Sequence, residues 1–156
     1  MKRLTFGVLA IFSLLTTVNG SASDLKTNTI VCENLSEFHR LWEDAAFGRD
    51  PSRTERAAWI LQSSGGKYQM LRWPHSAAWS KEQWRGAAPN SIVAQVHTHP
   101  VNASERPSSG DVRLANQIGT TIYVISAQGI WSVTSDGKIS KEQGPRWFKE
   151  LSNQCN

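Results

Sequence analysis

Short stretches rich in apolar and β-branched residues recur along the chain, and turn residues separate these stretches. Some are compact apolar runs and one, 68–73, alternates between apolar and polar residues, and both patterns are typical of β-strands. The predicted strands are residues 57–61, 68–73, 91–96, 120–125, 130–133 and 138–140. The turn Ser63-Ser64-Gly65-Gly66 joins the first two strands, and Ser135-Asp136-Gly137 joins the last two. Each of these pairs is therefore expected to form a β-hairpin.

Apolar residues at helical spacing predict a helix near the start of the folded part of the chain. Ser36 is a suitable N-cap, and Gly48 is expected to end the helix. The residues of its apolar face are Phe38, Leu41, Trp42 and Ala45. A short extended piece around residues 29–32 is expected to precede it.

Two more helices are predicted further along the chain. Ser108 or Ser109 can cap the second one, which Gly119 closes, and Pro145 opens the last one. The resulting order is helix, hairpin, strand, helix, strands and helix. This order predicts the α/β (α+β) class, with a single mixed β-sheet flanked by helices.

The first residues have the composition of a targeting segment. Lys2 and Arg3 precede an apolar run at 4–18, and small residues follow. This pattern predicts a secretory signal peptide over residues 1–22 and a single domain over 23–156. The alternative is an uncleaved membrane anchor, but the run is shorter than the roughly 20 residues that span a bilayer.

Charge and composition narrow the function classes. Without Lys2 and Arg3, the 17 basic residues fall to 15 against 13 acidic ones, which leaves a net charge of +2. The sequence has no dense stripe of Lys and Arg, so a nucleic-acid partner is not expected. We expect an exported protein, periplasmic or secreted, without stable membrane insertion after signal cleavage.

The chain has two cysteines, Cys32 and Cys155, near the two ends of the expected domain. In an oxidising compartment such a pair is expected to form a disulfide. Closing so long a loop stabilises a fold by roughly 4 kcal/mol in the chain-entropy model. The alternative is two buried free thiols.

His97 and His99 lie where a predicted strand ends, and Pro100 follows at once. Residues i and i+2 of a strand lie on the same face, so the two imidazoles can bind one metal ion. Asp111 follows in the first turn of a capped helix and is placed to turn back toward them. Two histidines and one carboxylate leave a fourth tetrahedral position open, which is the pattern of catalytic zinc with a water ligand.

The two remaining histidines are interpreted differently. His39 lies beside Phe38 on a predicted helix, and His75 follows Pro74 in irregular chain. Both are therefore expected to be surface residues or ordinary hydrogen-bonding partners.

The motif His97-Thr98-His99-Pro100, seven further residues and then Ser108-Ser109-Gly110-Asp111 resembles the JAMM signature of JAB/MPN-type zinc metallopeptidases. The resemblance covers residues 55–125 and implies that family's fold, with a cytidine-deaminase-like layout. The loop after Pro100 is about one residue longer than in the commonest form of the signature. We expect this loop to bulge without moving Asp111.

The resemblance also implies a role for each site residue. His97, His99 and Asp111 would ligate one zinc ion. Glu55, in the position of the family's upstream glutamate, would be the general acid and base, and Ser108 would donate a hydrogen bond to the oxyanion. Glu55 could instead be an ordinary solvated residue.

Two other carboxylates could replace Glu55 as the general base. Glu82 lies in an irregular stretch, and Glu105 lies in the loop between the metal ligands. Three tryptophans, Trp73, Trp79 and Trp84, could line a substrate groove. The alternative, which the sequence favours, is that they pack beneath a long loop.

The function expected from these features is hydrolysis of an amide bond by an exported zinc metallopeptidase or isopeptidase. Its substrate would be a peptide or protein, either a secreted protein or a peptidoglycan peptide of the cell wall. The alternative is a non-catalytic exported binding or immunity-type module on a JAMM-like scaffold. The sequence does not define the oligomeric state.

Overall fold

A computed structural model describes residues 29–50, 54–75 and 82–155. The predicted signal peptide, residues 1–22, and Trp79 lie outside the described residues. Within the described part of the chain, no helix is long and apolar enough to cross a membrane.

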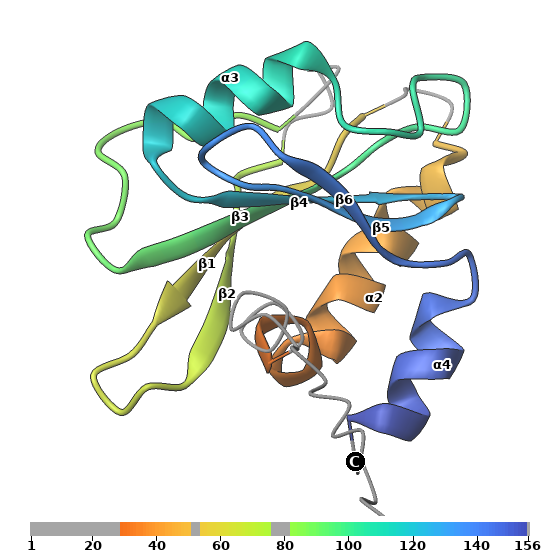
Figure 1. Cartoon of the computed structure of the whole chain (residues 1–156), viewed down its shortest axis with the longest axis horizontal. Helices are drawn as coiled ribbons and strands as arrows, with labels where there is room; N and C mark the ends of the chain where they lie inside the picture. The colour runs from red at the N-terminus through yellow and green to blue at the C-terminus, as the bar shows by residue number, and fades with distance from the viewer. Residues whose placement is uncertain (1–28, 51–53, 76–81, 156) are drawn as a thin grey trace, which may run out of the picture.

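The fold is α+β and is built on one six-stranded mixed sheet with the strand order β2-β1-β3-β4-β5-β6 (Figure 1). The strands are β1 (Ala57–Gln62), β2 (Tyr68–Arg72), β3 (Ile92–Thr98), β4 (Thr121–Ser126), β5 (Gly129–Val133) and β6 (Ile139–Gln143). Strands β3 and β4 are parallel, and every other neighbouring pair is antiparallel. Both predicted hairpins and the single mixed sheet are confirmed.

Helices cover both faces of the sheet. Helix α3 (Ser109–Ile118) forms the crossover between the parallel strands and lies on one face. Helices α2 (Leu35–Asp44) and α4 (Trp147–Gln154) lie on the other face (Figure 1). A short 3-10 helix, η1 (Ala46–Gly48), follows α2.

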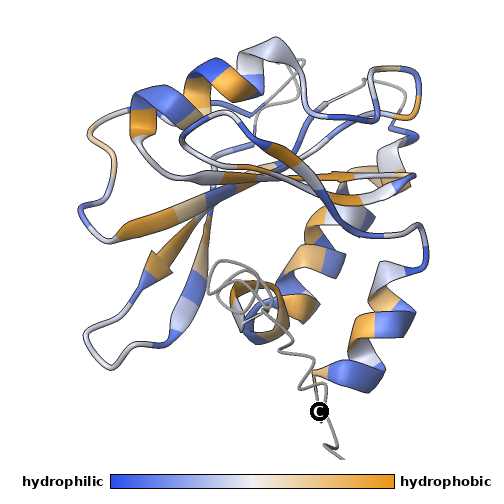
Figure 2. Ribbon diagram, viewed as in Figure 1, coloured by the Kyte–Doolittle hydropathy of each residue, from blue (hydrophilic) through white to orange (hydrophobic). Residues whose placement is uncertain are grey.

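The sheet therefore separates two hydrophobic cores. The larger core lies between the sheet and helices α2 and α4, and the smaller one lies beneath α3. Figure 2 shows the apolar stripes of the helices and the apolar strands between the layers. On β3, Ala94 and Val96 belong to the larger core, so the alternate residues Gln95 and His97 are directed to the α3 face.

The start of the domain differs from the sequence prediction. Residues 29–33 are helical rather than extended, and the cap of α2 is Asn34 rather than Ser36. The Asn34 side chain donates a hydrogen bond to the Ile30 carbonyl, and Ile30 and Val31 are buried in the larger core. Tertiary packing therefore imposes helix on a segment whose local sequence resembles a strand.

The end of α2 also differs from the prediction. The helix ends at Asp44, before Gly48, and η1 occupies the interval. Ala46 and Phe47 have positive φ values of 48° and 55°, so the chain leaves the helix through a strained turn. The predicted apolar face is confirmed, since Phe38, Leu41 and Trp42 are buried.

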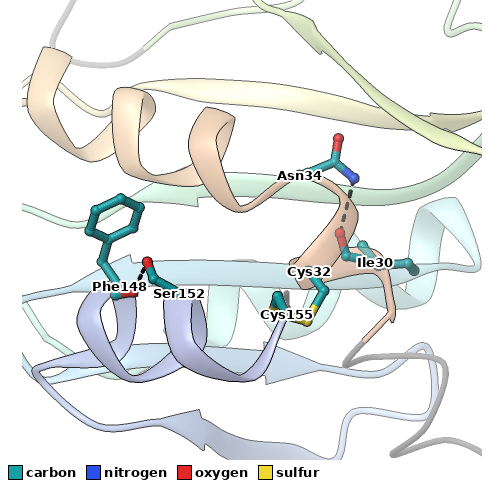
Figure 3. The surroundings of a disulfide bond; sticks show 6 residues. All are labelled: Ile30, Cys32, Asn34, Phe148, Ser152 and Cys155. Atoms are coloured by element: carbon teal, nitrogen blue, oxygen red, sulfur yellow. Dashed lines mark hydrogen bonds between the residues drawn. A yellow bond between two sulfur atoms is a disulfide. The ribbon is translucent and has the colours of Figure 1, made fainter.

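Cys32 and Cys155 form a disulfide with a Cα–Cα distance of 5.2 Å, as predicted. It joins the helical segment before α2 to the end of α4 (Figure 3). Both segments lie on the face of the sheet opposite α3. The disulfide therefore closes the domain on the side away from His97.

Candidate metal centre

His97 and His99 are held at the end of β3 by backbone hydrogen bonds to both neighbouring strands. The His99 N–H donates to the Ile125 carbonyl of β4 at 2.8 Å, and the Thr98 N–H donates to the Arg56 carbonyl at 2.9 Å. His97 and His99 are both 6% exposed. The predicted strand thus presents two buried imidazoles at the C-terminal end of β3, an interior strand of the sheet.

Asp111 reaches the same position from the first turn of α3. Ser108 is the N-cap of this helix, and it forms a capping box with Asp111. Gly119 closes the helix in the left-handed conformation with φ of 66°. Both predicted helix boundaries are confirmed, and the cap fixes the carboxylate that turns toward the histidines.

The three side chains converge on one point. The His97 Nε2 atom lies 3.1 Å from His99 Nε2 and 3.2 Å from Asp111 Oδ1. The distance from His99 Nε2 to Asp111 Oδ2 is 3.6 Å. Tetrahedral zinc with bonds of about 2.0–2.1 Å requires its ligand atoms to lie about 3.3 Å apart. The buried group of His97, His99 and Asp111 can therefore hold a metal ion.

Hydrogen bonds at the far side of each ring fix the histidine tautomers. The His99 Nδ1 atom lies 2.6 Å from the Ser104 carbonyl oxygen, which can only accept, so Nδ1 carries the proton. The His97 Nδ1 atom lies 3.1 Å from Gln95 Oε1, while the Gln95 amide nitrogen donates to the Val96 carbonyl. Each Nε2 atom can therefore offer a lone pair to a metal ion, and the two atoms lie close to each other and to a carboxylate.

The electrostatics of the site favour a neutral His99 and an ionised Asp111. Burial, followed by the neighbouring His97, lowers the pKa of His99 below its ordinary value. Burial alone would raise the pKa of Asp111, but donation and positive charge from His97 when that ring is protonated, together with the hydrogen bonds from Ser108, lower it overall. His99 is therefore neutral and Asp111 ionised near neutral pH.

Glu55 is half-buried and lies next to the metal-binding group. It lines a cavity of about 530 Å³ together with His97 and Asp111, and it interacts electrostatically with His99. Glu55 precedes β1, whose Ala57 pairs with His97 in the sheet. Alternation along the strand places Glu55 and Ala57 on the same face.

Glu82 lines the same cavity as Glu55, but its carboxylate is already paired, whereas Glu105 lies elsewhere. Glu82 is 5% exposed, and its two carboxylate oxygens accept hydrogen bonds from Arg56 Nη1 at 3.3 Å and from the Ala57 N–H at 2.7 Å. The Glu82 N–H donates to the Glu55 carbonyl at 3.0 Å. Glu82 therefore fixes the backbone directly after Glu55, on both sides of Arg56, rather than offering a free base. Glu105 is not among the described residues that line the cavity.

Ser108 has its hydroxyl engaged at the site. Its Oγ atom donates to Asp111 Oδ2 at 2.7 Å, and its backbone N–H donates to the same oxygen at 2.5 Å. Ser108 thus orients a candidate metal ligand. A hydrogen bond to a reacting oxyanion would require the hydroxyl to turn away from Asp111.

His39 and His75 lie apart from the metal-binding group, as expected. His39 stacks on Phe148 with ring centroids 3.7 Å apart. His75 contacts Arg56 and lies 3.6 Å from Glu82. Both act as local packing or hydrogen-bonding partners.

Sequence reasoning missed Gln95, Ser104 and Trp59. Gln95 could have been found, because residue i−2 of a strand lies on the face of His97. The Ser104 carbonyl could not, because it depends on the path of the loop. Trp59 lines the cavity with Trp73 and Trp84, two of the three predicted groove residues.

No protein-family model matches the chain, and no curated protein does. The resemblance to JAMM metallopeptidases therefore rests on the motif.

Proposed function

We propose that this protein is an exported zinc metallopeptidase of the JAMM type that hydrolyses an amide bond in a peptide or protein. One observation carries the proposal: two imidazole Nε2 atoms and a carboxylate whose pKa is lowered lie within 3.6 Å of one another. Such a group is stable only when a proton or a metal cation lies between its atoms. A bound divalent ion explains why the fold brings these atoms together.

The donor set fits zinc. Two imidazole nitrogens and one carboxylate oxygen form the three-ligand set of catalytic zinc sites. When bound, zinc would activate a water molecule for attack and would polarise the amide carbonyl. The hydrogen bonds from the Nδ1 atoms to Gln95 and Ser104 would keep both rings in the orientation that binding needs.

Glu55 would transfer the proton in this reaction. It lines the same cavity as His97 and Asp111 but is not part of the three-residue metal-binding group. Such a carboxylate can accept a proton from the attacking water and deliver it to the departing amine nitrogen. The contacts of Glu82 with the backbone at Glu55 and Ala57 would hold this general base in place.

Ser108 would support the reaction mainly through Asp111, because its hydroxyl and backbone N–H both donate to that carboxylate. We also propose that Ser108 donates a hydrogen bond to the oxyanion, which would require its hydroxyl to rotate away from Asp111. The disulfide fits a periplasmic or secreted location. Secreted proteins and peptidoglycan peptides are the proposed substrate classes.

The test combines metal analysis with hydrolysis assays. Wild type, Glu55→Gln and Glu105→Gln are purified, loaded with zinc and assayed on folded proteins, peptides and peptidoglycan fragments. We expect one zinc ion per chain in all three. Activity should fall at least about 100-fold in Glu55→Gln, which is typical for loss of a general base, and should persist in Glu105→Gln.

Other results would contradict the proposal. Zinc bound without hydrolysis of any substrate would favour the non-catalytic binding module. Absence of zinc from wild type would refute the metal centre. Full activity of Glu55→Gln would refute the assigned general base.

A further inference from the structure

The cavity beside the metal centre continues past Glu55 into an aromatic chamber formed by Trp59, Trp73 and Trp84. We propose that this chamber binds a large apolar side chain, aromatic or branched aliphatic, of the residue next to the cleaved amide. The inference deepens the proposed peptidase function and rests on it. It is an alternative to the packing role that the sequence alone favoured for Trp73 and Trp84.

Two walls of the chamber start at residues of the proposed active site, Glu55 and Asp111, and the residues further along each wall are apolar. On and just before β1, Glu55, Ala57 and Trp59 alternate on one face. On α3, the cavity is lined by Asp111, Leu114 and Ile118, at helical spacings of three and four. A peptide bound at the metal centre would therefore project a neighbouring side chain between the sheet and α3.

The distance from Glu55 to the chamber suits a substrate residue next to the cleaved amide. The Trp73 backbone N–H donates to the Ala57 carbonyl at 2.9 Å, so Trp73 lies beside Ala57, two residues after Glu55. Two residues of extended chain span about 7 Å. This length matches the reach of a large side chain from the residue beside the reacting amide.

The three tryptophan rings form a cluster with tilted and edge-to-face contacts. The ring centroid of Trp59 lies 4.8 Å from that of Trp73 and 6.2 Å from that of Trp84. The Trp84 indole N–H donates to its neighbour, the Ala87 carbonyl, at 3.1 Å. Trp73 and Trp84 are only partly buried, so they offer ring surface that a ligand can cover.

The size and charge of the cavity favour a large apolar side chain over an acidic one. A volume of about 530 Å³ lies within the range of small-molecule sites and exceeds what one aromatic side chain needs. The Glu82 carboxylate is paired with Arg56, and Glu55 and Asp111 are acidic. An acidic substrate side chain would meet carboxylates, whereas an apolar one would bury surface against Trp, Leu and Ile.

Cleavage preference provides the first test. Quenched fluorescent peptides that vary the residues on either side of the central amide among Phe, Leu, Ala, Lys and Asp are assayed with zinc-loaded wild type. We expect kcat/KM for Phe or Leu at one position to exceed that for Ala by about 10- to 100-fold. Trp84→Ala should reduce this ratio to within a few-fold through a loss of kcat/KM for the Phe and Leu peptides, while it still binds one zinc ion per chain.

Trp131→Ala is the matched control. Trp131 lies on β5 beneath Arg106 and packs against the smaller core, outside the cavity. This variant should keep the wild-type preference for large apolar residues. Equal cleavage of all peptides, a preference for Lys or Asp, or an unchanged preference in Trp84→Ala would overturn the inference.

A binding experiment separates failure of the pocket from failure of the peptidase function. N-acetyl-phenylalaninamide is titrated into ¹⁵N-labelled full-length protein, with N-acetyl-alaninamide as the comparison, and the indole N–H resonances are followed. The phenylalanine probe should shift the signals of Trp59, Trp73 and Trp84 but not that of Trp131. No shift would refute the pocket, whereas the expected shifts without peptide cleavage would refute only the peptidase function.

Discussion

Gln95 shows how one buried side chain prepares a metal ligand. Its Oε1 atom accepts from His97 Nδ1, and its amide donates to the Val96 carbonyl, so the amide cannot flip without losing both contacts. We expect Gln95→Leu to weaken zinc binding about 10- to 100-fold, the usual effect of removing such a partner. Competition with a zinc chelator measures the change. Gln95→Glu keeps an acceptor and should lose less, so equal affinity of the Leu variant and wild type would contradict this role.

The lowered pKa of His99 predicts how the metal-free protein responds to acid. The unfolded chain binds a proton at the ordinary value of 6.5, whereas folded His99 does so only at lower pH. Between these two values the unfolded state binds more protons, so stability falls as pH decreases from 6.5 toward the folded pKa. Asp111, whose pKa is lowered, adds stability that is present above 3.8 and is lost at more acidic pH.

Thermal melting of the metal-free protein between pH 7.5 and 5.0 measures the His99 effect. The melting temperature should fall as the pH passes below 6.5. The decrease should be smaller in His99→Gln, because that variant lacks the titrating ring. A wild-type melting temperature that rises on acidification through this range would show that the sign is wrong.

At the scale of elements, local patterns predicted the parts of the site but not how they meet. The strand before His97 and the cap at Ser108 could be predicted, because alternation and capping act within a few residues. The pairing of Ala57 with His97 could not, because the register of two distant strands depends on the whole sheet. The hydrogen bonds of Glu82 with the backbone at Glu55 and Ala57 could not be predicted either, because they also join distant parts of the sequence.

The turn after α2 supports the loop that follows His99. The Gly48 carbonyl accepts a hydrogen bond from the Val101 N–H at 2.8 Å. Gly48 has φ of 74°, and a Cβ atom there would lie 2.6 Å from the Trp42 ring and 3.1 Å from the His99 carbonyl oxygen. An exchange of this glycine would therefore disturb helix packing and the metal-binding segment together.

Gly48→Ala and Gly66→Ala form a matched pair that isolates this contact. Gly66 also has a positive φ, 81°, but a Cβ atom there would meet nothing within 4 Å. We expect Gly66→Ala to lower the free energy of unfolding by about 1 kcal/mol through backbone strain, and Gly48→Ala to lower it by about 3 kcal/mol or more. Urea denaturation measures both values. Equal losses would show that Trp42 and the His99 backbone adjust freely.

At the scale of the whole molecule, the sheet separates the larger core and the disulfide from the candidate metal centre. The larger core and the disulfide lie on the face of α2 and α4, whereas His97, Asp111 and the cavity lie on the face of α3. The sequence predicted the disulfide because it contains only two cysteines. It could not predict that the disulfide lies on the face opposite the site, since the assignment of helices to faces depends on non-local packing.

This separation predicts that the disulfide stabilises the fold without shaping the metal centre. The two cysteines are 123 residues apart in sequence, so the double variant Cys32→Ser/Cys155→Ser should lose roughly 4 kcal/mol of stability through the greater entropy of its unfolded chain. Its melting temperature should fall clearly, while the zinc content of the folded fraction and the affinity for zinc should match those of wild type. Reduction of the wild-type disulfide should reproduce both results, which excludes an effect of the serines themselves. Loss of zinc from the folded double variant would contradict this prediction. It would show that a change on the face of α2 and α4 reaches His97 through β3, so that the two faces of the sheet are coupled.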